Sequence, residues 1–179
     1  MSSVPVLVNR LKACQAGAQH WKAFEDICTE ILTYLFVPPL RAPVVQARTY
    51  SGIDRRDLVF PNRNDTGTSN WARLYRELSA RMVLFEFKNY DKSDIGKDEV
   101  IQTRSYLRKA MGRLAVIVSS KMPDNSAHIR RNGIFSEDQV VILFLRPEHL
   151  EDMLYIKERG EDPSDVMMDE LELFYLQHE

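Results

Sequence analysis

The chain has 179 residues, 44% of them hydrophobic and 28% charged, which fits one compact domain, so we treat residues 1–179 as a single unit. No apolar run approaches the roughly 20 residues of a membrane span, and the start is unlike a secretory signal, so we expect a cytoplasmic protein without a membrane segment. The net charge of −2 hides an uneven distribution, because residues 41–131 carry a net +8 and residues 132–179 a net −10.

Hydrophobic spacing predicts two helices at the start of the chain. The first begins at Pro5 and ends near Gly17. The second runs over residues 21–35, where apolar residues recur at helical period, and two consecutive prolines at 38 and 39 stop it.

A β-hairpin is predicted next. Residues 44–50 and 56–60 are rich in β-branched and aromatic side chains, and Ser51 and Gly52 punctuate the two runs. A polar loop follows over residues 61–70, and we expect Asn70 to cap a short helix with Trp71 facing inward.

The second half of the chain alternates between apolar strands and helices. We expect strands at residues 82–87, 114–118 and 140–145, and helices from Ser93 or Asp94 to about Met111 and from Asp124 onward. Two further helices, over residues 147–156 and 163–176, are separated near Gly160. This order predicts an α/β fold with a central mixed β-sheet flanked by helices, and extra acidic helices at residues 147–179.

Two charged residues leave the apolar run at residues 82–88. Alternation places Glu86 and Lys88 on one strand face with Leu84, while Val83 and Phe85 occupy the other. A buried charge requires a partner or a metal ion, so the pair forms either an ion pair at a strand end or part of a chemical site.

A second carboxylate lies within the preceding apolar segment, at Asp57. Two carboxylates on neighbouring strands can hold one hard cation, and magnesium keeps water in its remaining positions. Such an ion lowers the pKa of bound water and neutralises phosphate charge, and Lys88 could orient or deprotonate that water or stabilise developing charge. Two isolated cysteines and four scattered histidines give no disulfide framework and no zinc spacing.

These residues together resemble a known family. Residues 51–57, the strand segment Phe85-Glu86-Phe87-Lys88, and Gln102 with Tyr106 on the next predicted helix resemble the PD-(D/E)XK nuclease superfamily, particularly its Mrr-like and RecB-like restriction-endonuclease branches. The resemblance covers roughly residues 20–145 and implies a restriction-endonuclease-like core.

The resemblance implies a role for each matched residue. Asp57, Glu86 and the backbone carbonyl of Phe87 would bind Mg²⁺, for which Mn²⁺ could substitute, and Lys88 would be the catalytic base or stabiliser. Glu25 lies on or beside the apolar stripe of its predicted helix, and in the family a glutamate of the first helix reaches the metal or its waters.

Gln102 and Tyr106 are one helical turn apart and could both touch the active-site water, Lys88 or a phosphate. The alternative for this pair is an ordinary amphipathic rim. The basic middle of the chain is consistent with a polyanion-binding surface, although chance clustering on solvated faces would give the same counts. Candidate phosphate contacts are Arg55, Arg56, Arg104, Arg108 and Lys109. Trp21 and Trp71 are predicted to be core residues rather than base-stacking platforms.

The resemblance implies a metal-dependent endonuclease that cuts DNA rather than RNA, in restriction, repair or defence against foreign elements such as phage. The sequence shows no separate specificity domain, so we expect the nuclease of a larger protein or assembly, a targeting partner, or a homodimer. Two alternatives remain: a module of the same fold that binds nucleic acid without cutting it, and a docking protein that acts through its acidic C-terminal helices.

Overall fold

The computed structural model describes residues 3–52 and 55–178. One five-stranded sheet in the order β1-β2-β3-β4-β5 forms the centre of the fold. The first two strand pairs are antiparallel and the last two are parallel, so the sheet is mixed. The strands are β1 (Val44–Arg48), β2 (Arg55–Pro61), β3 (Met82–Lys88), β4 (Leu114–Ser119) and β5 (Val141–Leu145).

Helices precede, connect and follow the strands. They are α1 (Val4–Ala13), the 3-10 turn η1 (Ala18–His20), α2 (Trp21–Phe36), α3 (Asn70–Leu78), α4 (Lys97–Tyr106), α5 (Asn125–Asp138), α6 (Pro147–Glu158) and α7 (Asp165–Gln177). The parallel strands need long crossovers, and α4 and α5 provide them between β3 and β4 and between β4 and β5.

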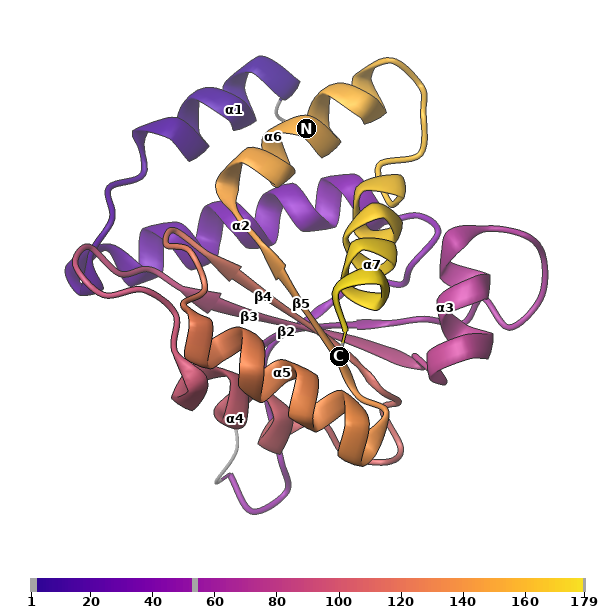
Figure 1. Ribbon diagram of the computed structural model, residues 1–179. Coiled ribbons are helices and arrows are strands. Elements are labelled where there is room, and N and C mark those ends of the chain that lie inside the picture. The colour runs from indigo at the N-terminus through magenta and orange to yellow at the C-terminus, as the bar shows by residue number, and fades with distance from the viewer. Residues whose placement is uncertain (1–2, 53–54, 179) are drawn as a thin grey trace.

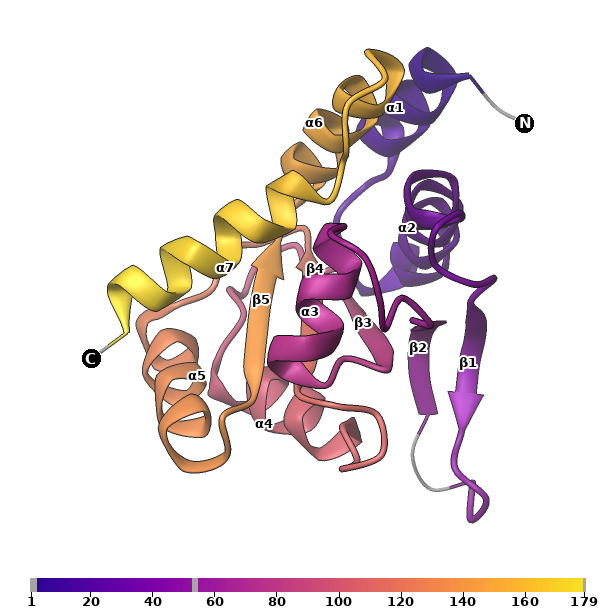
Figure 2. The same ribbon diagram turned by 90° about the vertical axis from the view of Figure 1, so that its right-hand side faces the viewer.

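The sheet is the middle layer of three. Helices α1, α2 and α6 lie over one face, while α4 and α5 lie over the other, as Figures 1 and 2 show. Alternating strand residues point to opposite faces of the sheet. Phe60, Phe85 and Val116 belong to the core under α2. Leu84 and Ile117 belong to the core under α4 and α5. This burial on both faces explains why β4 and β5 consist almost entirely of apolar residues.

The predicted strands and the α/β class with a mixed sheet are confirmed, and the strand ends differ from the prediction by no more than two residues. Part of the hairpin turn, residues 53 and 54, lies outside the described residues. Helix α2 ends before the two prolines as predicted, because Val37 already has an extended backbone.

The predicted ends of helices α1, α3 and α4 were wrong. Helix α1 ends at Ala13 rather than near Gly17, because the Asn89 side chain binds the carbonyl oxygens of Gln15 and Gly17 and holds this segment in a non-helical path. Ser69, not Asn70, caps α3, since its hydroxyl accepts a hydrogen bond from the N–H of Ala72 at 3.2 Å.

Helix α4 is shorter at both ends than the predicted helix over residues 93–111. It begins after Gly96, whose N–H donates to the Glu99 carboxylate, while the preceding Ile95 forms a β-bridge with Pro123. After Tyr106 the chain turns inward, and Gly112 packs so closely on the Ser79 carbonyl that any side chain there would collide with it.

The acidic C-terminal helices pack on the body of the protein. Leu171 and Phe174 of α7 are buried in the main core, but Leu173 and Leu176 are exposed, so the predicted apolar stripe covers the core only in part. None of the helices within the described residues has both the length and the apolar character needed to cross a membrane.

Candidate active site

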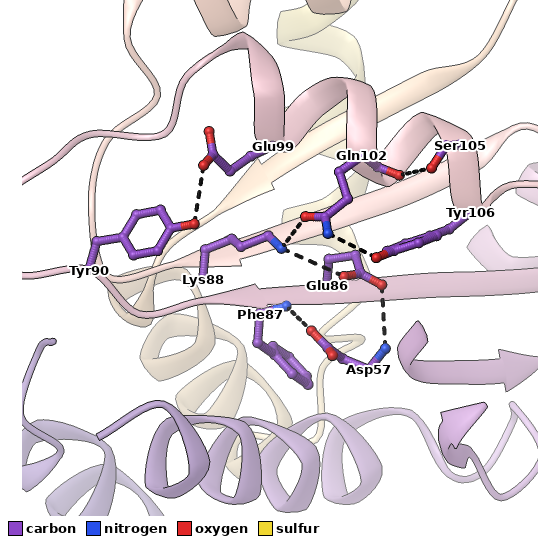
Figure 3. Close-up of polar contacts among 9 residues, drawn as sticks. All are labelled: Asp57, Glu86, Phe87, Lys88, Tyr90, Glu99, Gln102, Ser105 and Tyr106. Carbon is purple, nitrogen blue, oxygen red and sulfur yellow. Dashed lines mark hydrogen bonds and ion pairs between the residues drawn. The ribbon is translucent and has the colours of Figure 1, made fainter. Parts of the chain in front are cut away.

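The candidate site forms where β2 and β3 stop pairing as a regular ladder. Leu58 is the first residue of β2 with a ladder partner on β3, which is Phe85, so Asp57 lies just before the ladder. Beyond this pair, carboxylates replace the backbone acceptors: the Asp57 N–H donates to Glu86 Oε1 at 3.3 Å, and the Phe87 N–H donates to Asp57 Oδ2 at 2.9 Å (Figure 3). Each strand therefore holds the acid of the other strand in place.

Both carboxyl groups are unusually easy to protonate in the absence of a cation. Burial, and then the nearby charge of Asp57, raises the pKa of Glu86 from 4.5 to about 8, although Lys88 acts in the opposite direction. Burial also raises the pKa of Asp57, against the opposing effects of the Phe87 N–H and Lys88. Two buried acids that repel each other would gain from a shared positive charge.

Lys88 extends from the end of the same strand toward α4. Its Nζ lies 3.9 Å from Glu86 Oε2 and donates to Gln102 Oε1 at 2.8 Å. The Gln102 amide in turn donates to the Tyr106 hydroxyl at 2.9 Å (Figure 3). One face of α4 thus orients the amine that lies beside the acid pair.

These groups line a cleft of about 390 Å³. The first turn of α2 and the preceding segment form one wall, α4 forms the other, and the ends of β2 and β3 form the floor. The lining residues are Ala18, Trp21, Phe24, Glu25, Arg55, Asp57, Glu86, Phe87, Lys88, Asn89, Tyr90, Gln102 and Tyr106.

Glu25 lies in the same cleft and is 2% exposed. The Gln46 amide donates to its Oε1 at 2.9 Å, and Lys22 Nζ lies 3.4 Å from the same oxygen. Across residues 3–52 and 55–178, no three His, Cys, Asp or Glu side chains gather closely enough to hold a metal ion together. Glu25 therefore does not form a three-carboxylate cluster with Asp57 and Glu86 among these residues.

The donor set suits a hard divalent cation. Asp57 and Glu86 offer carboxylate oxygens, and the resemblance adds the backbone carbonyl of Phe87. Magnesium commonly binds through one or two carboxylates and retains several waters, so the buried Glu86 and the half-buried Asp57 fit its requirements without further protein ligands.

The predicted phosphate contacts occupy three different environments. Arg55 is exposed and lines the cleft, whereas Arg56 is buried and donates to the backbone carbonyl of Tyr106 at 2.9 Å. Arg104 pairs with Asp138 at 2.8 Å. Arg108 and Lys109 are exposed and, with Arg104, line a separate basic groove that also contains Arg81 and Arg113.

The prediction that both tryptophans belong to the core holds only for Trp71, which is 1% exposed. Trp21 is 46% exposed and lines the cleft. Trp21 was predicted to be buried because it lies on the apolar stripe of α2. The buried part of this helix starts only at Phe24, so the first turn extends beyond it.

Sequence reasoning also missed Gln46, Asn89 and Tyr90. Gln46 adopts a left-handed backbone at φ 51° and binds Glu25, and Asn89 ties the segment before α2 to the end of β3. The Tyr90 hydroxyl donates to Glu99 of α4 at 3.1 Å. Of these three residues, only Asn89 and Tyr90 could have been proposed from the sequence, because they directly follow the Glu86-Phe87-Lys88 segment.

Comparisons of this chain with protein-family models, with curated proteins and with solved structures found no match. Function is therefore inferred from the geometry of the cleft and from the resemblance of its residues to a nuclease motif.

Proposed function

We propose that this chain is a metal-dependent nuclease with a restriction-endonuclease-like core, and that it hydrolyses phosphodiester bonds in the cleft between α2 and α4. One observation carries the proposal. Asp57 and Glu86 are held together between two strands, with the Lys88 amine 3.9 Å from Glu86. A cation site and an oriented amine thus lie side by side on the cleft floor.

Each residue of the cleft has a distinct part in this proposal. Asp57, Glu86 and the Phe87 carbonyl hold Mg²⁺, or Mn²⁺ in its place, and when bound this ion acidifies water and neutralises charge on the phosphate. Lys88 orients the attacking water, accepts its proton or stabilises the charge that develops during attack. Gln102 and Tyr106 position Lys88, Glu25 orders water near the acids, and Arg55 binds a phosphate at the cleft edge.

The resemblance suggests DNA as the substrate and defence or restriction as the setting. A cleft of about 390 Å³ carries none of the extended surface that reads a long sequence, so specificity would come from a partner, a larger assembly or a second copy of the chain.

A substrate panel tests the proposal directly. Purified protein is incubated with plasmid DNA, linear DNA and RNA in Mg²⁺, in Mn²⁺ and in chelator. We expect cleavage that requires the metal ion and disappears in chelator. Metal-independent binding without cleavage of any of these substrates would instead identify a non-cutting nucleic-acid-binding module of the same fold.

A further inference from the structure

Trp21 occupies an unusual place for the largest apolar side chain. It is the first residue of α2, lines the cleft, and is 46% exposed. The other tryptophan, Trp71, is 1% exposed and packs edge-on against Phe36. An exposed tryptophan in a cleft leaves apolar area in water that a flat ligand could cover.

The other aromatic residues of the cleft are less exposed than Trp21. Phe24 is 2% exposed, Tyr90 is bonded to Glu99, and the Tyr106 hydroxyl accepts a hydrogen bond from Gln102. Lys22 makes a cation–π contact with Trp21, with its Nζ 6.0 Å from the ring centre, and also pairs with Asp26 at 2.6 Å. Trp21 is therefore the most exposed aromatic side chain of the cleft lining.

The spacing between Trp21 and Glu25 along α2 fits a nucleotide. Trp21 and Glu25 are four residues apart and share one face of α2, which separates them by about 6 Å along the helix axis. This is of the order of one nucleotide step. The cleft volume of about 390 Å³ is in the range of sites that hold one small molecule, such as a nucleotide.

We propose that Trp21 is a stacking platform for an unpaired nucleobase, and that the cleft accepts a single strand or a locally unpaired stretch. The ring would bind the base, while Arg55 and Lys88 would face the adjoining phosphates and direct one of them toward Asp57 and Glu86. Stacking on an aromatic side chain is tolerant of sequence because every base has a π face. This inference rests on the proposed nuclease function and adds the substrate form to it.

Tryptophan fluorescence provides a direct measurement of stacking. The probes are a ten-residue single-stranded deoxyadenylate, the matching adenylate RNA, a DNA duplex of the same length, and the deoxyadenylate strand with its bases removed. All are added at pH 7 without metal, so that no cleavage occurs. We expect the single strands to quench the fluorescence of the parent protein, and the duplex and the abasic strand to quench it little.

Variants assign the signal to one residue. Trp21→Phe retains only the buried Trp71, so its fluorescence should not respond to the strand. Trp21→Ala should weaken single-strand binding roughly tenfold or more, and Trp21→Phe should weaken it less. Tyr155→Ala removes an exposed aromatic on α6 and is the matched control, for which we expect unchanged binding. Thermal melting of each variant verifies that it is folded.

The outcomes separate this inference from the proposed nuclease. Quenching through Trp21 without metal-dependent cleavage would retain the stacking site and refute the nuclease. Cleavage with equal binding by the parent and a folded Trp21→Ala would refute the stacking site and retain the nuclease. Quenching that is equal for strand, duplex and abasic probe would also overturn the inference. The DNA and RNA arms identify which sugar the site accepts.

Discussion

The Nζ atom of Lys88 lies 3.9 Å from Oε2 of Glu86 and only 2.8 Å from Oε1 of Gln102. The lysine is therefore held more closely by a neutral amide than by the adjacent acid. A tight ion pair would occupy the carboxylate, whereas this arrangement leaves Glu86 available to a cation and keeps the amine at its side. The helix that supplies Gln102 thus has a positioning function in the proposed mechanism.

Removing Gln102 should impair turnover more than substrate binding. In Gln102→Ala the Lys88 amine loses the acceptor that orients it, so we expect kcat to fall by about tenfold to a hundredfold with KM little changed. Tyr106→Phe removes only the hydroxyl that binds Gln102 and should give a smaller decrease. Steady-state kinetics and thermal melting are measured together. A loss of stability without a selective effect on kcat would show that the contact is merely structural.

The acid pair should make the metal-free protein less stable as the pH rises. The pKa of Glu86 is raised to about 8 from an ordinary 4.5, so between these values the folded protein binds a proton that the unfolded chain has released. The free energy of unfolding therefore falls as pH rises through this window, by up to about 5 kcal/mol, because each pKa unit corresponds to about 1.4 kcal/mol. A protein of this size should then lose on the order of 10 °C in Tm.

Glu86→Gln is the matched control for this pH effect, because the amide keeps the shape and cannot ionise. Its Tm should be much less sensitive to pH over the same window, and Mg²⁺ at pH 8 should restore Tm in the parent but little in the variant. Equal pH slopes for the two metal-free proteins would contradict the assigned cause.

The basic groove beside α4 should contribute to binding through phosphate contacts. Replacing Arg108 and Lys109 together with alanine should weaken binding to all sequences alike and lower the slope of log affinity against log salt by about 1.5. The control is Asp169→Asn on the exposed side of α7. Affinity is measured over a salt series, and an unchanged slope in the double variant would exclude this groove from the interface.

The C-terminal helix should be part of the folded core. Leu171 is fully buried, so Leu171→Ala should cost about 2–5 kcal/mol of stability, while Leu176→Ser at a side chain 84% exposed should change stability by less than about 0.5 kcal/mol. Deleting residues 163–179 should lower Tm strongly without changing the oligomeric state of the protein. A change of oligomeric state at unchanged Tm would indicate an interface between copies instead.

The sheet was predictable because its strands are strong local signals. β3, β4 and β5 are short apolar runs bounded by polar or turn residues, and alternation correctly assigned Phe85 and Leu84 to opposite cores. The helix ends were less predictable because they depend on distant contacts. Helix α1 ends at Ala13, and the segment after it is held by Asn89, which binds the carbonyl of Gly17 from 72 positions away in the sequence.

The site residues could be proposed from sequence, but their arrangement could not. The spacing of Lys88 and Gln102 gives no distance between an amine and an amide on separate elements. Arg56 was predicted to contact phosphate, but the fold buries it against the Tyr106 carbonyl, to which it donates a hydrogen bond. The exposure of Trp21 depends on where the buried face of α2 begins, which helical periodicity does not specify.

The most direct test of the central claim compares Lys88→Ala with Glu86→Gln in one experiment that measures both Mg²⁺ binding by calorimetry and phosphodiester cleavage. Both variants should lose cleavage, by about 10²-fold or more for Lys88→Ala. Lys88→Ala should still bind Mg²⁺ because both carboxylate ligands remain, whereas Glu86→Gln, like Asp57→Asn, should bind it weakly and recover some cleavage at high metal concentration. If both folded variants bind Mg²⁺ and cut as well as the parent, the assignment of this cleft as a metal-dependent nuclease site is contradicted.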